Sequence, residues 1–144
     1  MEENTFDAQV TWVQGLQFVG RAATPGPTVV FDGEAAHGGS DCGLRPVAAL
    51  LSSLAACTGM DVISILQKKR QRVTGLTINV KATRAEEYPK AVLKAELEYV
   101  VRGYDVAPEA VARAIELSQT KYCAVAASLK GEVVTTYRIE PETV

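Results

Sequence analysis

The sequence lacks a strong excess of charge of either sign. Its 144 residues include 15 Lys or Arg and 17 Asp or Glu, for a formal net charge of −2. Binding to nucleic acid or to anionic lipid depends on a concentrated basic face, which this balance does not supply. We therefore expect no nucleic-acid partner and no partner at a membrane surface.

No apolar run reaches the roughly 18–20 residues that are needed to span a bilayer. The chain begins with the acidic and polar residues 1–4, whereas a secretory signal begins basic and continues apolar. From these two absences we expect a cytoplasmic protein with no membrane anchor and no secretory signal.

Cysteine and histidine are scarce, at three residues and one. An odd number of cysteines leaves at least one thiol unpaired, and cytosolic thiols are kept reduced. His37 and Cys42 form His-x4-Cys without a second close pair, whereas a zinc site takes three or four ligands. No phosphate-binding glycine motif or Gly-x-Ser-x-Gly turn occurs. We expect neither a metal nor another cofactor.

Apolar residues make up 47% of the chain, and their periods predict its secondary structure. Alternation over residues 5–19 predicts a hairpin, and residues 28–31 predict a third strand. After a glycine-rich loop at 32–45, helical spacing predicts a long, mostly apolar helix over about 46–70. Such a helix is usually central in a fold.

The second half of the chain repeats both patterns. Alternation at 76–82 and 93–101, around a turn at 86–90, predicts a long antiparallel hairpin. Pro108 opens a second helix, a short helical piece follows at about 122–129, and residues 133–139 predict a last strand. The order βββ-α-ββ-α-α-β indicates an α+β fold in a single domain, 1–144.

Two cysteines lie in contexts that favour chemistry as well as packing. Cys57 stands inside the long helix among leucines, alanines and Gly59, and a cysteine there is more often core filler. Cys123 opens the short helical piece, where the helix dipole acidifies a thiol. The two could face each other across a core, but sequence spacing leaves this open. Cys42, in the glycine-rich loop, is interpreted as an exposed thiol.

Two segments carry a resemblance to a known family. GLRPVAALLSSLAACTGMDV at residues 43–62, together with YCAV at residues 122–125, resembles the OsmC/Ohr family, and most of all its OsmC-like branch. The resemblance implies an intertwined homodimer in which antiparallel sheets wrap two long central helices.

The resemblance also implies an activity, the reduction of organic hydroperoxides to alcohols. It makes Cys57 the peroxidatic thiol and Cys123 the resolving thiol, with a disulfide intermediate. An external dithiol, of the lipoyl type in the family, then restores both thiols.

One departure from the family concerns the cation beside the reactive thiol. Ohr-type members hold an arginine there with a glutamate near the start of the central helix, where this sequence has Val47 and Ala48. Arg45, at the helix entrance, is the first candidate for the cation, acting within one chain or across the dimer, and Arg21 is the second. Asp61, one turn beyond Cys57, would hold such an arginine or, if unpaired, oppose thiolate formation.

Two other functions stay open at this point. The missing glutamate also fits a binding module whose apolar dimer pocket holds a hydrophobic small molecule, with redox-sensing or vestigial thiols. The other is a stable stress-related dimer without catalysis, whose thiols react no faster than a free cysteine.

Overall fold

The computed structural model of the chain describes residues 4–22 and 26–143. Residues 1–3, on which the expectation about a signal partly rests, lie outside the described residues. The chain divides into two compact units, Met1–Leu50 and Leu51–Val144, each of which has its own three-stranded sheet. The single-domain expectation stays a prediction.

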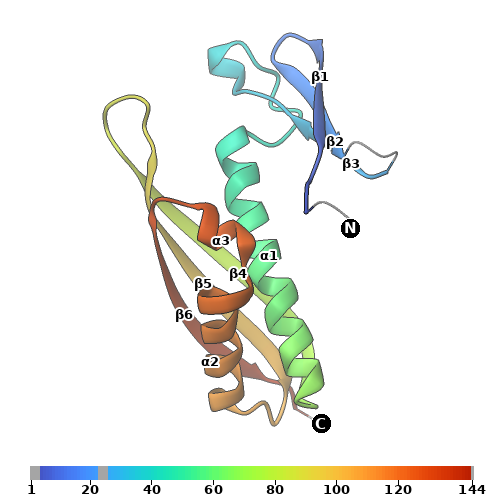
Figure 1. Cartoon of the computed structure of the whole chain (residues 1–144), viewed down its shortest axis with the longest axis vertical. Coiled ribbons are helices and arrows are strands. Elements are labelled where there is room, and N and C mark those ends of the chain that lie inside the picture. The colour runs from blue at the N-terminus through green and yellow to red at the C-terminus, as the bar shows by residue number, and fades with distance from the viewer. Residues whose placement is uncertain (1–3, 23–25, 144) are drawn as a thin grey trace. The chain divides into compact units, whose positions relative to one another are not determined.

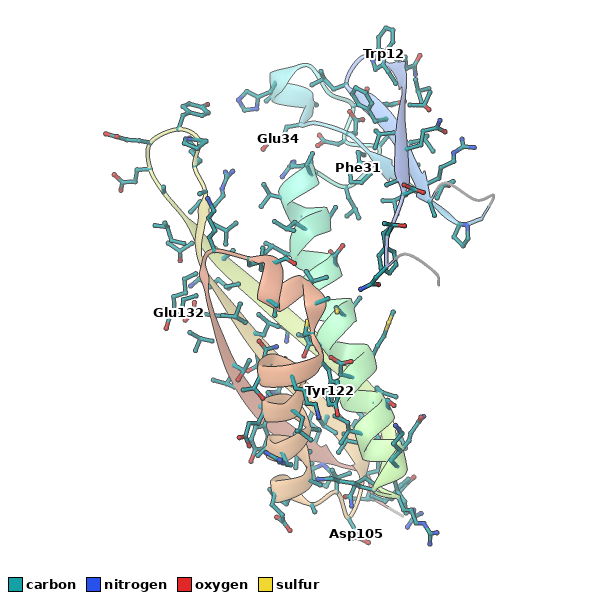
Figure 2. All side chains as sticks on the ribbon, in the orientation of Figure 1. Trp12, Phe31, Glu34, Asp105, Tyr122 and Glu132 are labelled. Carbon is teal, nitrogen blue, oxygen red and sulfur yellow. The ribbon has the colours of Figure 1, made fainter. Side chains whose placement is uncertain are left out.

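The N-terminal unit contains an antiparallel sheet of β1 (Ala8–Gln14), β2 (Gln17–Ala22) and β3 (Thr28–Phe31), in that order. The predicted hairpin and third strand are therefore confirmed. Figure 2 shows Trp12 near the β1–β2 turn, where its indole Nε1 donates a hydrogen bond of 2.8 Å to the carbonyl of Gly15. Gly15 takes a positive φ of 53°, a conformation that glycine adopts without strain.

The loop after β3 is organised around the buried carboxylate of Asp32. It accepts hydrogen bonds from the N–H groups of Gly33 at 2.7 Å, Ser40 at 3.1 Å and Cys42 at 3.1 Å. Burial favours a higher pKa for Asp32, but these hydrogen bonds outweigh it and hold the pKa below the ordinary value. The same loop contains a single 3-10 turn, η1 (Ala35–His37).

The predicted long helix is α1 (Pro46–Lys68), which ends two residues before the predicted boundary. Arg70 adopts a left-handed φ of 57°, and the N–H of Gln71 donates to the carbonyl of Leu66. This is a common way for a helix to end, because it satisfies a carbonyl of the last turn.

By length and composition, α1 is apolar enough to cross a membrane, with a mean hydropathy of 1.7 over its best 18-residue window. The expectation that the chain has no such stretch was wrong, because small Ser, Thr and Gly residues interrupt this helix without making it polar. The core helix of a soluble protein meets the same criterion, so α1 alone is weak evidence for a membrane span.

The C-terminal unit contains a sheet of β4 (Arg72–Arg84), β5 (Val92–Tyr104) and β6 (Glu132–Pro141). The predicted β4–β5 hairpin is antiparallel. The expectation of wholly antiparallel sheets needs one correction, since β6 runs parallel to β5. Helical segments make the crossover that a parallel pair requires.

The crossover consists of α2 (Pro108–Leu117), the π-helical turn η2 (Ser118–Tyr122) and α3 (Ala124–Ser128). The predicted second helix and the short helical piece are confirmed, while the π-helical turn between them was not predicted. With these additions the order of elements follows the prediction, and the α+β class is confirmed.

The core of the C-terminal unit lies between the sheet and the helices on one of its faces (Figure 1). Side chains of α1, β5 and α2 that are at most 5% exposed form its centre: Leu54, Val62, Leu66, Leu97, Tyr99, Val101, Val111, Ala114 and Ile115. Burial of each large apolar side chain contributes about 1.5–3 kcal/mol. This packing fixes the face of α1 that carries Thr58 and sets the position of Cys57 beside it.

Candidate functional site

The fold of the C-terminal unit brings Cys57 and Cys123 together. Cys57 lies within α1 and is half-buried, whereas Cys123 lies between η2 and α3 and is only 4% exposed. Both cysteines are free, Cys57 packs against the buried cluster that contains Cys123, and its side chain is close enough to raise the pKa of the Cys123 thiol. Two thiols in contact are the starting geometry for a reversible disulfide.

The backbone around Cys123 holds its thiol in place. Its N–H donates to the carbonyl of Ser118 at 2.8 Å, which closes the π-helical turn. Its Sγ accepts a hydrogen bond of 3.4 Å from the N–H of Ala126 and so caps α3. The expectation that Cys123 opens the short helix is therefore confirmed.

Burial raises the pKa of the Cys123 thiol above its ordinary value of 9.0. The Ala126 N–H acts in the opposite direction, but the Cys57 side chain and the charges of Cys57 and Asp61 raise the pKa further. Cys123 is therefore held as a neutral thiol at neutral pH. Because the thiolate is the nucleophilic form, this thiol needs a reactive partner close by to react.

A buried polar cluster lies beside the thiol pair. The hydroxyl of Thr58 is 2.8 Å from that of Tyr99 and 2.7 Å from that of Ser118, and Ser118 donates to the Asp61 carboxylate at 2.8 Å. The Gln119 amide donates to both Thr58 and Tyr99 at 3.3 Å. The cluster thus ties α1, β5 and η2 together at the level of the two cysteines.

The Asp61 carboxylate fixes the direction of these hydrogen bonds. An ionised carboxylate only accepts, so the single hydroxyl proton of Ser118 points to Asp61. Ser118 must then accept from Thr58, and Thr58 accepts from Tyr99. Burial raises the pKa of Tyr99, so that Tyr99 remains a donor at neutral pH. In this series of hydrogen bonds, each hydroxyl donates to the next one in the direction of Asp61.

The sequence analysis did not identify this cluster as part of a site. The sequence did contain a sign of the cluster. Thr58 and Ser118 occupy positions on the apolar faces of predicted helices, and Tyr99 belongs to an alternating strand. A hydroxyl at a core position needs a hydrogen-bond partner. The partners are far away in the sequence, so the pairing could not be deduced.

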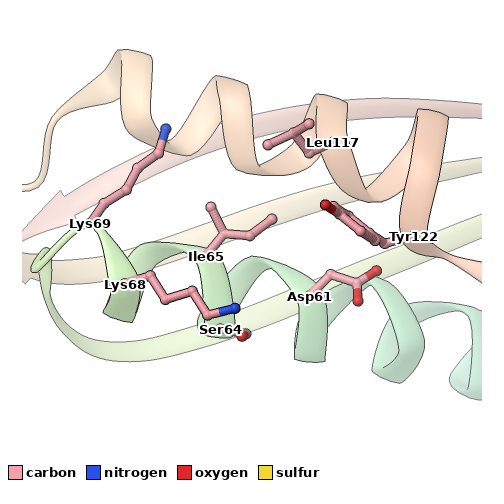
Figure 3. Close-up of a pocket in the computed structure, with 7 residues that line it drawn as sticks. All are labelled: Asp61, Ser64, Ile65, Lys68, Lys69, Leu117 and Tyr122. Carbon is pink, nitrogen blue, oxygen red and sulfur yellow. The ribbon is translucent and has the colours of Figure 1, made fainter.

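A pocket of about 360 Å³ opens beside Asp61 (Figure 3). Asp61 lies four residues beyond Cys57, on the same side of α1. Most of the lining comes from the last turns of α1, and the rest comes from Lys69 just after α1, from α2 and from η2. The lining residues are Asp61, Ser64, Ile65, Lys68, Lys69, Leu117 and Tyr122. The lining combines apolar side chains with two lysines, a carboxylate and a hydroxyl.

Arg45, the first candidate for the activating cation, lies in the N-terminal unit. Its guanidinium is 3.3 Å from a carboxylate oxygen of Asp41 and 3.6 Å from one of Glu34, in an exposed cluster. Arg21, the second candidate, lies on β2 opposite Thr28 and is exposed. The role of either arginine at Cys57 stays a prediction.

Asp61 has a partner other than the arginine that the sequence analysis considered. Its carboxylate accepts from Ser118, and its charge raises the pKa of Cys123. The effect of this carboxylate on Cys57 stays a prediction, while at Cys123 it disfavours the thiolate.

Cys42 lies apart from the thiol pair in sequence and belongs to the N-terminal unit. It is exposed, as expected, and its thiol donates to the carbonyl of Ser40 at 3.3 Å. Within residues 4–22 and 26–143, no group of three or more His, Cys, Asp or Glu side chains could hold a metal ion.

An α+β chain with two adjacent free thiols in its core defines a class of protein, a dithiol protein with a half-buried and a fully buried cysteine. The family described as OsmC-like protein matches residues 37–138, and this chain belongs to that family. The match covers Cys57 and Cys123, and the resemblance seen in the sequence is confirmed.

Among its relatives, protein YhfA of Escherichia coli K12 is 38% identical over 133 residues, which is 92% of this chain and 96% of YhfA. A solved structure of a protein from Aquifex aeolicus VF5 is 27% identical with a TM-score of 0.84, covering 98% of this chain and all of that one. An organic hydroperoxide resistance protein from Elizabethkingia anophelis shares the fold, with 14% identity, a TM-score of 0.66, and coverage of 98% and 99%.

Proposed function

We propose that this protein reduces organic hydroperoxides to alcohols through Cys57 and Cys123, as a homodimer in the cytoplasm. The observation that carries the proposal is the contact between the two thiols, one half-buried and one buried. Solved structures with the same fold include organic hydroperoxide resistance proteins, which supports hydroperoxides as the substrate class.

The exposure of the two cysteines supports the role proposed for each. Cys57 is half-buried and accessible to a small molecule, so it attacks the peroxide. Cys123 is 4% exposed, has a raised pKa and contacts Cys57, so it resolves the intermediate. A buried thiol of raised pKa is a poor first nucleophile and is also protected from oxidation by solvent.

In the first step, the Cys57 thiolate attacks the distal oxygen of the hydroperoxide. The S–O bond forms, the O–O bond breaks, and the alkoxide takes a proton and leaves as the alcohol. The sulfur is oxidised to a sulfenic acid, and the peroxide is reduced.

In the second step, the sulfur of Cys123 attacks the sulfenic sulfur of Cys57. The S–S bond forms, the S–O bond breaks, and hydroxide leaves with the Cys123 proton as water. An external dithiol then reduces the disulfide by two exchange steps and becomes a disulfide itself. A lipoyl-type dithiol fits this last step by the family resemblance.

The pocket beside Asp61 supplies a site for the organic part of the substrate. Ile65, Leu117 and the ring of Tyr122 give it an apolar floor one helical turn and more from Cys57. Burial of an alkyl group there favours organic over hydrogen peroxide, by about 0.8 kcal/mol for each buried CH₂ group.

Arg45 remains our proposed cation for the activation of Cys57. Its present partners, Glu34 and Asp41, are exposed, and surface ion pairs of this kind contribute little free energy, about 0–1 kcal/mol. The arginine is therefore able to exchange them for a thiolate in an assembled dimer.

A hollow of about 550 Å³ in the C-terminal unit supports the homodimer. It lies between α1 and β4, and it is lined by small and apolar side chains: Ala55, Ala56, Gly59, Met60, Ile63, Leu76 and Ile78. Met60 is 71% exposed there, although such side chains are normally covered. Small residues along α1 allow the same helix of a second copy to approach closely.

Turnover of cumene hydroperoxide with a dithiol reductant tests the proposal, with cumyl alcohol as the product measured. Cys57→Ser should lower turnover at least about a hundredfold, because the nucleophile is lost. Cys42→Ser is the matched control, and it should keep turnover within about twofold since Cys42 belongs to an exposed loop. Turnover in Cys57→Ser equal to that of the parent would overturn the proposal.

A further inference from the structure

One buried side chain, Ser118, contacts the elements that carry both thiols. Its hydroxyl lies 2.7 Å from that of Thr58 and donates to Asp61 at 2.8 Å. Its carbonyl accepts the N–H of Cys123 at 2.8 Å. Ser118 and Thr58 are fully buried, so their contact is shielded from competing water.

The two side chains that Ser118 contacts both follow Cys57 along α1, within about one helical turn. Thr58 is the next residue, and Asp61 lies one helical turn further on. The Ser118 hydroxyl therefore holds α1 at Cys57, while the Ser118 carbonyl holds the backbone of Cys123. The spacing between the two cysteines is set by this one residue and by the core around it.

We propose that Ser118 is a positioning residue for closure of the Cys57–Cys123 disulfide, with Asp61 as the anchor of its hydroxyl. The inference rests on the proposed function, in which that disulfide forms during each cycle. It assigns a role to a polar cluster that the two-cysteine mechanism does not itself require.

The physical reason is the narrow geometry of a disulfide. The Cα atoms of its cysteines lie within roughly 7 Å, and the Cβ atoms are about 3.8 Å apart. Cys57 and Cys123 belong to different elements, so a small shift of η2 along α1 moves the sulfurs out of reach. Loss of the Ser118 hydroxyl removes a donor from the Asp61 carboxylate and an acceptor from the Thr58 hydroxyl, which keeps only Tyr99 and Gln119 as partners. The direct tie between α1 and η2 is then lost, which permits that shift.

A dipyridyl disulfide measures closure without any peroxide. The Cys57 thiolate attacks one sulfur of the reagent, an S–S bond forms to Cys57, and one thiopyridone leaves. Cys123 then attacks the Cys57 sulfur, the protein disulfide forms, the S–S bond to the pyridyl group breaks, and the second thiopyridone leaves with the Cys123 proton. The first phase depends on reagent concentration and the second does not, so the second phase reports closure. The parent for all variants is Cys42→Ser, which removes the exposed thiol.

We expect Ser118→Ala to slow the second phase at least about tenfold, because it lowers the effective concentration of Cys123 at Cys57. Ser128→Ala is the matched control: it removes an exposed serine hydroxyl that bonds to the Ala124 carbonyl of α3. Its rate of disulfide closure should stay within about twofold of the parent rate. Ser118→Ala closing at the parent rate would overturn the inference.

A pair of substitutions at Asp61 separates positioning from charge. Asp61→Asn keeps an acceptor for Ser118 and removes the charge that raises the pKa of Cys123, so closure should be as fast as in the parent or faster. Asp61→Leu removes the acceptor and should slow closure as Ser118→Ala does. Equal closure rates in the two Asp61 variants would contradict the anchor role, and this pair decides the matter if Ser118→Ala fails to fold.

The experiment distinguishes this inference from the proposed function. A parent protein that closes its disulfide with the dipyridyl reagent but consumes no hydroperoxide overturns the proposed function and leaves the positioning role supported. A parent that consumes hydroperoxide while Ser118→Ala closes normally overturns the positioning role alone.

Discussion

Cys57 packs against the buried cluster that contains Cys123 and raises the pKa of its thiol, although α1 carries the first and the second follows a π-helical turn. The contact is asymmetric, since Cys57 is half-buried and Cys123 is 4% exposed. Packing of α1 and α2 on one sheet face maintains it. The account of function depends on this contact, and the predictions below test its parts.

Replacement of the buried thiol should interrupt the cycle after its first step. Cys123→Ser keeps Cys57, so one equivalent of cumene hydroperoxide is still reduced, but no disulfide forms inside the chain. The Cys57 sulfenic acid then persists and is oxidised further to sulfinic acid by excess peroxide. Intact-mass spectrometry checks this through additions of one and then two oxygen atoms. An unmodified Cys57 after peroxide treatment would contradict the prediction.

The reactivity of Cys123 should appear only at alkaline pH. In a variant with Cys42→Ser and Cys57→Ser, we expect alkylation of Cys123 by iodoacetamide to rise with pH with a midpoint above 9.0, because burial and Asp61 favour the neutral thiol. The folded chain holds this proton more tightly than the unfolded chain does. The contribution of the Cys123 thiol to stability is therefore complete below its pKa in the unfolded chain. It is lost as the pH rises through its pKa in the folded chain.

A midpoint at or below 9.0 would contradict the raised pKa. Asp61→Asn in the same background provides the control. It removes one of the causes of the shift, so the midpoint should move down while burial of the thiol is kept.

Stability of the C-terminal unit should depend on the buried leucines of α1. Leu66 is 0% exposed, and Leu66→Ala should lower the free energy of unfolding by about 2–5 kcal/mol, because it removes buried surface and leaves a cavity. Leu93→Ala is the matched control, since Leu93 is 54% exposed and should cost about 0.5 kcal/mol or less. Urea denaturation of both variants measures the difference, and equal losses would contradict the proposed core.

A charge in the hollow between α1 and β4 should dissociate the proposed dimer. Met60→Glu places a carboxylate at a side chain that is 71% exposed in the single chain and that a second copy would cover. The mass in solution, measured by light scattering, should fall from that of two chains to that of one. Leu93→Glu, on β5 outside this hollow, should leave the mass at two chains. A single-chain mass for the parent protein would refute the dimer itself.

Much of the fold could be predicted from apolar periods alone. The spacing of Leu54, Val62 and Leu66 gave α1, and alternation gave both hairpins. The direction of β6 could not be predicted in the same way, because alternation is identical in parallel and antiparallel strands. The π-helical turn was also missed, since Ser118 continues the period of α2 without a break.

The site was predictable in part. The pairing of Cys57 with Cys123 followed from the family resemblance, and their spacing alone left it open. The Thr58–Ser118 contact joins residues far apart in the chain, and no local pattern encodes it. Arg45 was chosen for its position at the helix entrance, and its role awaits a test by substitution.

The central claim is most directly tested by stopped-flow consumption of cumene hydroperoxide by the pre-reduced protein, beside hydrogen peroxide, with thiols counted before and after. The account predicts faster consumption of the organic peroxide, loss of two thiols per chain, and a Cys57–Cys123 link in the mass spectrum. Slow and equal consumption of both peroxides with intact thiols would contradict it, and would favour a protein that binds a hydrophobic small molecule.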